Sequence, residues 1–192
     1  MSPATTAVTA ETVTAAFARR TAPVAALGAD ADALAAACHA MARRFHRGGR
    51  LLAMGTGAAA ADAAHVVVEF VHPVIMGKRA LSAFGLPDGG SAATVALFGG
   101  AEDIALAFSP DGASPRLADA LAEAARRGML TVALLGGGAD GSGGTMARAP
   151  GLDHAIVVPS TDTRVVREAH VTAYHVLWEL VHVFLDAPEV LT

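Results

Sequence analysis

Two segments of the chain place two histidines and a glutamate at offsets of four and seven residues. They are His65, Glu69 and His72, followed much later by His175, Glu179 and His182. A helix turns by about 100° per residue, so these offsets return to nearly the same face. Imidazole and carboxylate suit Zn²⁺ and related divalent ions, and the same groups serve as general acids and bases. We call each set of three side chains on one helix face a ladder. The spacing predicts that the two ladders form a metal or acid–base site. The alternative is that these histidines are hydrogen-bonded in a core or an interface.

Two junctions rich in small residues are candidates for anion binding. In "GTGAAAAD", Gly55 and Gly57 would let the backbone approach an anion at a helix N-terminus, although a tight strand-to-helix turn needs the same glycines. This segment lacks the lysine of a P-loop and the third glycine of a dinucleotide-binding turn. In "SPDGAS", Ser109 and Ser114 could hold a phosphate that Asp111 would repel, or simply cap a turn.

Alternating helices and strands must position these residues. Repeats of apolar residues at three and four predict helices over residues 10–28, 30–49, 56–73, 115–128 and 162–186. Short apolar runs predict strands over residues 50–55, 103–108, 129–137 and 153–160, and residues 80–86 are a candidate for a short strand. Residues 92–100 fit a helix or a strand. The alternation predicts an α/β fold with a parallel sheet, helices on both faces, and ligands at the carboxyl ends of the strands.

Composition limits the kinds of partner. The 192 residues are 53% apolar and only 17% charged, which predicts burial of surface in an oligomer. A formal net charge of −4 without any Lys/Arg run argues against nucleic acid. The single cysteine, Cys38, excludes an internal disulfide and suits a reducing cytosol. Without a signal-like N-terminus or a long uncharged apolar window, we expect a cytoplasmic protein with no membrane partner.

The order of these segments resembles the sugar isomerase (SIS) domain, and most closely its phosphoheptose (sedoheptulose 7-phosphate) isomerase branch. That branch has G-N-G-G-S-x-x-D-A-x-H-x-x-x-E-L after its first strand, S-T-S-G-N-S before a later helix, and Q-E-x-H-x-x-x-x-H in the last helix. The matching segments here are "GTGAAAADAAHVVVEF", "SPDGAS" and "REAHVTAYH". The resemblance implies one domain over residues 1–192, with N-terminal helices (1–48, a helical hairpin) before a flavodoxin-like three-layer αβα core (49–192). About five parallel strands and a homo-oligomer, with a tetramer favoured, are implied as well.

The resemblance also implies roles for individual residues. Glu69 and His175 would be the acid–base pair that moves a proton between adjacent sugar carbons, and His65 would join them in holding Zn²⁺. The ladder spacing adds weaker metal candidates, namely His72, Glu179 and His182. The residues expected to bind the substrate or its phosphate are Gly55, Gly57, Asp62, Ser109, Ser114 and Arg167.

This chain departs from the family pattern mainly in its phosphate-binding loops. Ala59 replaces the serine of the first loop, while the second keeps only its outer serines and gains Asp111. Arg167 stands where the pattern has a glutamine that ligates the metal. Loss of hydroxyl donors and gain of an acid should weaken phosphate binding. We therefore expect a metal-dependent sugar-phosphate isomerase of aldose–ketose type, or alternatively a non-catalytic SIS-fold protein that binds a metal or ligand and acts in regulation or assembly.

Overall fold

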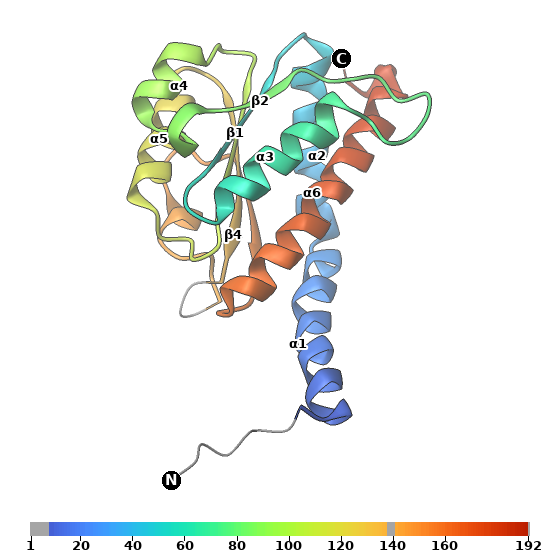
Figure 1. Ribbon diagram of the computed structural model, residues 1–192. Coiled ribbons are helices and arrows are strands. Elements are labelled where there is room, and N and C mark those ends of the chain that lie inside the picture. Colours follow the sequence, from blue (N-terminus) through green and yellow to red (C-terminus); the bar gives the residue numbers. More distant parts are fainter. Residues whose placement is uncertain (1–7, 138–140, 192) are drawn as a thin grey trace.

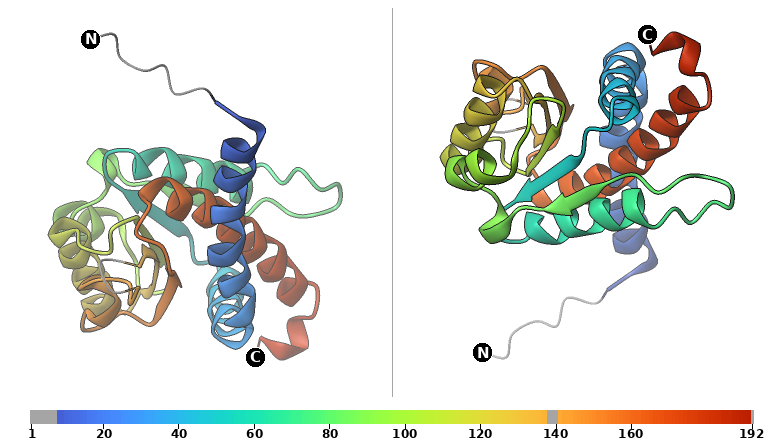
Figure 2. Two further views of the ribbon diagram at one scale, coloured as in Figure 1. Left: turned by 90° about the horizontal axis from the view of Figure 1, so that it is seen from below. Right: turned by 90° about the horizontal axis from the view of Figure 1, so that it is seen from above.

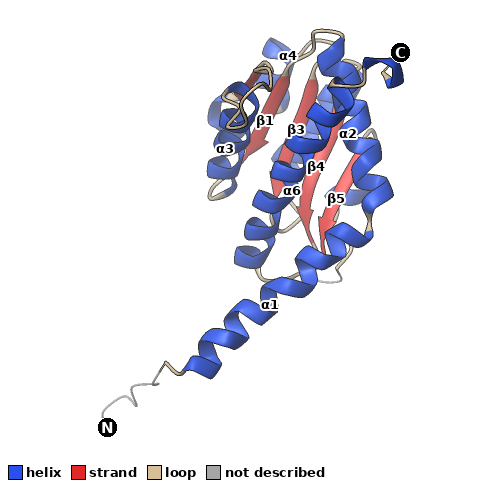
Figure 3. Cartoon of the chain, turned by 90° about the vertical axis from the view of Figure 1, so that its right-hand side faces the viewer, coloured by secondary structure: helices blue, strands red, loops and turns tan. Residues whose placement is uncertain are grey.

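The sheet is built from strands that the apolar runs predict. The computed structural model describes residues 8–137 and 141–191. Within them five parallel strands pair in the order β2-β1-β3-β4-β5. Strands β1, β3, β4 and β5 can be followed in Figure 3. Their bounds are β1 Leu51–Gly55, β2 Ala83–Gly85, β3 Ile104–Ser109, β4 Leu130–Gly136 and β5 His154–Val158. Every residue of β1, β3 and β4 is buried, as expected for strands covered on both faces. The predicted five-stranded parallel sheet is confirmed.

Helices cover both faces of this sheet. Their bounds are α1 Ala10–Ala29, α2 Ala31–His46, α3 Ala59–Val71, α4 Ala92–Phe98, α5 Pro115–Arg126 and α6 Thr163–Leu185. Helices α4 and α5 pack on one face, and α2, α3 and α6 pack on the other (Figures 1 and 2). Alternate residues of each strand point to opposite layers, so Leu51 and Ala53 belong to one apolar cluster, Leu52 and Met54 to the other. The three-layer αβα arrangement is therefore confirmed.

The two N-terminal helices are present but do not form the expected hairpin. Their axes meet at a bend of 66°, and α1 leads away from the sheet instead of folding back along α2 (Figure 1). Asp30 alone separates them, whereas two antiparallel helices need a loop of about two to five residues. No single helix in the described ranges has the length and apolarity to cross a membrane, although the bent α1–α2 pair meets those two criteria together.

The topology directs two loops and two helices to one region. Strands β1 and β3 are neighbours in the sheet. From β1 the chain passes through α3 to β2 at one edge of the sheet, whereas from β3 it passes through α5 to β4, toward the opposite edge. The carboxyl ends of β1 and β3 therefore flank the point where strand order reverses, which is where open α/β sheets bind ligands. Helices α3 and α6 lie side by side on the same face (Figure 1). The seam between α3 and α6 carries both residues expected to move the proton, Glu69 and His175.

Candidate active site between helices α3 and α6

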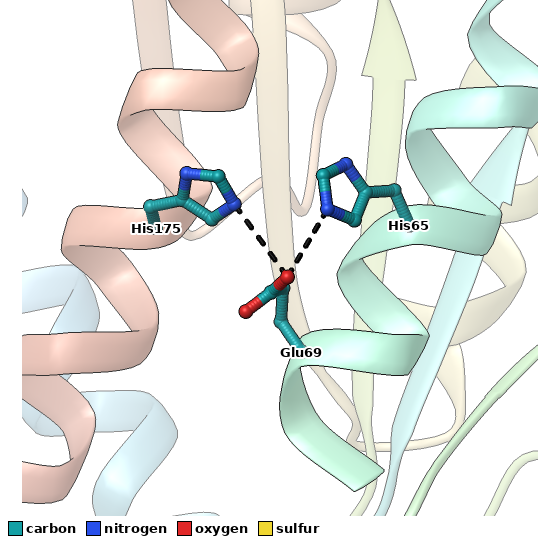
Figure 4. A group of neighbouring side chains, drawn as sticks. All are labelled: His65, Glu69 and His175. Carbon is teal, nitrogen blue, oxygen red and sulfur yellow. Dashed lines mark hydrogen bonds and ion pairs between the residues drawn. The ribbon is translucent and has the colours of Figure 1, made fainter. Parts of the chain in front are cut away.

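Three of the expected residues meet in the seam between the two helices (Figure 4). His65 and Glu69 lie one turn apart on α3, and His175 approaches them from α6. Glu69 Oε1 is 3.1 Å from His65 Nε2 and 3.7 Å from His175 Nε2. The glutamate side chain is 13% exposed, while both histidines are nearly half exposed. The cluster therefore has a carboxylate at its base and two imidazoles that reach solvent.

A tyrosine lies beneath this cluster. The Tyr174 hydroxyl is 2.5 Å from His65 Nδ1, and the Tyr174 side chain is fully buried. Burial raises the pKa of the phenol, which therefore keeps its proton. From the sequence, Tyr174 suggested only packing or interface contacts, since nothing in the spacing linked it to His65. No feature of the sequence pointed to this contact, because the two residues are 109 positions apart.

A cleft of about 290 Å³ opens beside the cluster, lined by Glu69, Val74, His175, Trp178 and Glu179. The Trp178 indole N–H is buried there and makes no hydrogen bond within the described part of the chain. Glu179 is exposed and lies one turn beyond His175 on α6. Glu179 thus shares the cleft without joining the three clustered residues.

Asp62 and Arg167, both expected to bind substrate, bind each other. Arg167 donates two hydrogen bonds to the Asp62 carboxylate, from Nε at 2.8 Å and from its terminal nitrogen at 3.1 Å. The Asp62 side chain is 6% exposed and that of Arg167 is 33% exposed. The hydrogen bond to Asp62 raises the pKa of the Arg167 guanidinium. The cation that replaces the family glutamine is thus neutralised, and both residues line a cavity of about 320 Å³.

The two glycines after β1 make a tight turn possible. A side chain at Gly55 would place its Cβ 2.4 Å from the backbone oxygen of Ala59, and Gly57 has a φ of +57°. This geometry fits the strand-to-helix turn that was one of the two interpretations of the segment. A cavity of about 180 Å³ at the carboxyl end of β1 is lined in part by Gly55 and Gly85.

The serine loop after β3 uses its polar groups internally. Ser109 Oγ donates to Asp111 Oδ1 at 2.9 Å, and the Ala113 backbone N–H donates to the same oxygen at 3.1 Å. Ser114 is the N-cap of α5, and its hydroxyl accepts a bond from the Leu117 N–H at 3.4 Å. The loop therefore forms a capped turn whose acidic residue takes two of its donors.

The outer members of the two ladders do not join the cluster. His72 lies just beyond the end of α3 and is exposed, with φ −122° and ψ 73°, because the following Pro73 disfavours a helical conformation. His182 is buried, and its ring nitrogens face the backbone oxygens of Trp178 at 2.9 Å and Arg79 at 3.2 Å. The expectation of two complete ladders is thus corrected, and neither His72 nor His182 reaches the His65–Glu69–His175 group.

His170, in the segment matching the family pattern, is fully buried near Phe108, with ring centroids 6.1 Å apart. Burial lowers the pKa of this imidazole to about 4. His170 is therefore neutral at physiological pH and belongs to the packed layer under the seam.

Comparisons with known proteins agree with this architecture. No protein-family model matches the chain. The phosphoheptose isomerase of Pelobacter propionicus is 36% identical over 158 residues, which cover 74% of this chain and 80% of the relative. The enzyme of the same name from Solidesulfovibrio magneticus is 33% identical over 170 residues, covering 81% and 80%. The solved structure of phosphoheptose isomerase from Neisseria gonorrhoeae superposes with a TM-score of 0.77 at 25% identity, covering 89% of this chain and 97% of that one. The chain therefore belongs to the phosphoheptose isomerase family of sugar-phosphate isomerases.

Proposed function

We propose that this chain interconverts the aldose and ketose forms of a phosphorylated sugar such as sedoheptulose 7-phosphate. In this proposal Glu69 and His175 move the proton, and His65, Glu69 and His175 hold a Zn²⁺ ion. The observation that carries the proposal is the meeting of these three side chains, from two helices far apart in sequence, at the edge of one cleft.

An aldose–ketose isomerisation needs a base and an acid that reach adjacent carbons. The Glu69 carboxylate would remove the proton from the carbon next to the carbonyl, and a protonated His175, released from the metal for this step, would return one to the neighbouring position. The proton held by Glu69 would then pass to His175, which restores both groups. The two groups lie 3.7 Å apart, so a substrate in the cleft could contact both. Low exposure of Glu69 also excludes much of the water that would compete for the proton.

The donor set fits a zinc ion. Ligand bonds of about 2.0–2.2 Å in a tetrahedron separate the ligand atoms by about 3.3 Å. The Glu69 oxygen lies 3.1 Å and 3.7 Å from the two imidazole nitrogens, close to that value. Three protein donors leave a fourth position for water or substrate, as in catalytic zinc sites. When bound, zinc would polarise the sugar carbonyl and so acidify the adjacent C–H bond.

For the substrate phosphate we propose the junctions at the carboxyl ends of β1 and β3. Gly55 and Gly57 would expose backbone N–H groups there, and hydroxyls would come from Ser109 at the end of β3 and Ser114 at the start of α5. We assign Asp62 and Arg167 a different task, because their mutual hydrogen bonds tie α3 to α6. We also propose a homotetramer, which would cover Val13 and Phe17, two exposed apolar side chains on the projecting α1. Light scattering of the purified protein tests that assembly.

One observation favours a second candidate function. Asp111 occupies two donors of the proposed phosphate loop, so a non-catalytic protein that binds a metal or ligand and serves in regulation or assembly is the alternative.

The deciding experiment incubates zinc-loaded protein with sedoheptulose 7-phosphate and follows the sugar by NMR. We expect turnover that Glu69→Gln lowers by about 10²–10⁴ and that Glu102→Gln retains. Glu102 is a suitable control because it pairs with Arg47 before the start of β3, at the opposite end of the strands. A folded, zinc-binding protein that converts neither this sugar nor a panel of sugar phosphates would favour the non-catalytic function.

A further inference from the structure

We propose that Tyr174 is a positioning residue that orients the His65 imidazole toward Glu69 and His175. The inference rests on the proposed function, since it concerns how one member of the proposed site is held. Its basis is the hydrogen bond between the Tyr174 hydroxyl and His65 Nδ1, together with the packing that fixes the phenol ring.

Packing prevents the Tyr174 ring from moving. Its centroid lies 5.3 Å from that of His65 and 5.0 Å from that of His175, with both pairs edge-on. Phe108 packs against the same ring at 5.8 Å with an interplanar angle of 90°. A fully buried side chain held on three sides keeps its hydroxyl at one point under the cluster.

That fixed hydroxyl determines which nitrogen of His65 faces the cluster. Nδ1 meets Tyr174 at 2.5 Å, so Nε2 is left to face Glu69 Oε1 at 3.1 Å. Rotation of the imidazole would break both contacts and leave the buried hydroxyl without this partner. His65 is nearly half exposed, so without Tyr174 its ring has the room to turn.

The hydroxyl suits this position because it can both donate and accept. A neutral imidazole has one N–H and one acceptor nitrogen. When Nε2 carries the hydrogen and donates to Glu69, the phenol donates to Nδ1. If a cation took the Nε2 lone pair, the hydrogen would move to Nδ1 and the phenol oxygen would accept it. A phenylalanine would keep the ring contacts and lose both of these arrangements.

Tyr174→Phe tests the inference with two readouts. In metal-free protein, the ¹⁵N shift of His65 Nδ1 should move to the value of an imidazole nitrogen without a hydrogen bond. The dissociation constant for Co²⁺, a spectroscopic probe for a zinc site, should rise by about tenfold or more, the usual effect of losing a hydrogen-bond partner of a metal-bound histidine. Circular dichroism and thermal melting verify that the variant is folded.

Trp178→Phe is the matched control. Trp178 lies one turn further along α6, lines the same cleft, and has an N–H with no hydrogen bond in the described structure, so its replacement should leave the His65 shift in place. An unchanged Nδ1 shift in Tyr174→Phe, or a changed shift with unchanged Co²⁺ affinity, overturns the positioning role. If the wild-type protein binds no Co²⁺, the zinc part of the proposed function fails. The positioning role is then decided by the Nδ1 shift and by ring-to-ring nuclear Overhauser contacts between His65 and Tyr174.

Discussion

Replacing Arg167 should destabilise the protein much more than replacing its partner. In Arg167→Gln the Asp62 carboxylate, only 6% exposed, loses both guanidinium hydrogen bonds. Leaving a buried charge unpaired costs about 3 kcal/mol, at the lower end of such measurements because the pair is open on one side. In Asp62→Asn the guanidinium remains 33% exposed and can still bind water, so the loss is about 1.5 kcal/mol.

The double variant shows whether these effects share one cause. Asp62→Asn with Arg167→Gln removes both charges at once and leaves two neutral amides in their place. We expect a total loss of about 2 kcal/mol, below the sum of the single changes, which is a coupling free energy of about 2.5 kcal/mol. Such coupling would mean that the pair holds α3 against α6, and so sets the distance between Glu69 and His175.

Urea unfolding followed by circular dichroism measures all four proteins. Arg20 and Glu168 provide a control, because they form a similar two-bond ion pair between α1 and α6 with side chains 34% and 50% exposed. That exposed pair should couple by less than about 1 kcal/mol. If Asp62 and Arg167 couple no more strongly than the control, the pair does not order the seam, and Arg167 is a free cation that could bind substrate.

Three further predictions concern acid–base chemistry, pH and phosphate. Glu69→Gln should lower kcat for the sugar phosphate by about 10²–10⁴ without changing the melting temperature, and an unchanged kcat would exclude Glu69 as the base. Burial lowers the pKa of His170 to about 4, whereas a histidine in the unfolded chain has its ordinary pKa of about 6.5. As the pH falls from 6.5 toward 4 the unfolded state therefore binds a proton that the folded state does not, and the free energy of unfolding decreases. His170→Leu should remove about 2.5 kcal/mol of the stability difference between pH 7 and pH 4.5 in urea unfolding, and an unaltered difference would contradict this assignment. Asp111→Ser frees the Ser109 hydroxyl and removes a negative charge, so calorimetry should show inorganic phosphate binding about tenfold more tightly, and equal affinity would show that Asp111 does not compete with phosphate.

The fold could be predicted because its evidence is local and repeated. Each buried strand is a short apolar run, and alternation with helices leaves few arrangements other than a layered parallel sheet. The relative direction of α1 and α2 could not be predicted in the same way. It depends on the backbone angles of Asp30 alone, and composition does not specify them.

In the candidate site, too, the local contacts could be predicted from the sequence, whereas contacts between distant segments could not. His65 and Glu69 are four residues apart on one helix, so their proximity follows from the sequence. His175 reaches them only because α3 packs on α6. The repeated spacing suggested that the two helices share a site, and the family resemblance named His175 as the partner of Glu69. The exclusion of His72 was available in the sequence, since Pro73 follows it. The contact of Tyr174 with the site could not be predicted from the sequence, because its partner, His65, lies on another helix.

The β3–α5 loop and the His65–Glu69–His175 cluster differ in how they would receive a ligand. At the β3–α5 loop, Ser109 and the Ala113 N–H already hold a carboxylate, so a phosphate bound there as we propose would have to displace Asp111. In the seam, the partners of Glu69 among the described residues are the imidazoles of His65 and His175. With Glu179 in the same cleft, the seam is acidic, and a second anion would be repelled there. A divalent cation bound between Glu69 and the two histidines would make the electrostatic potential of this region positive. The cation and the phosphorylated sugar should therefore each strengthen the binding of the other.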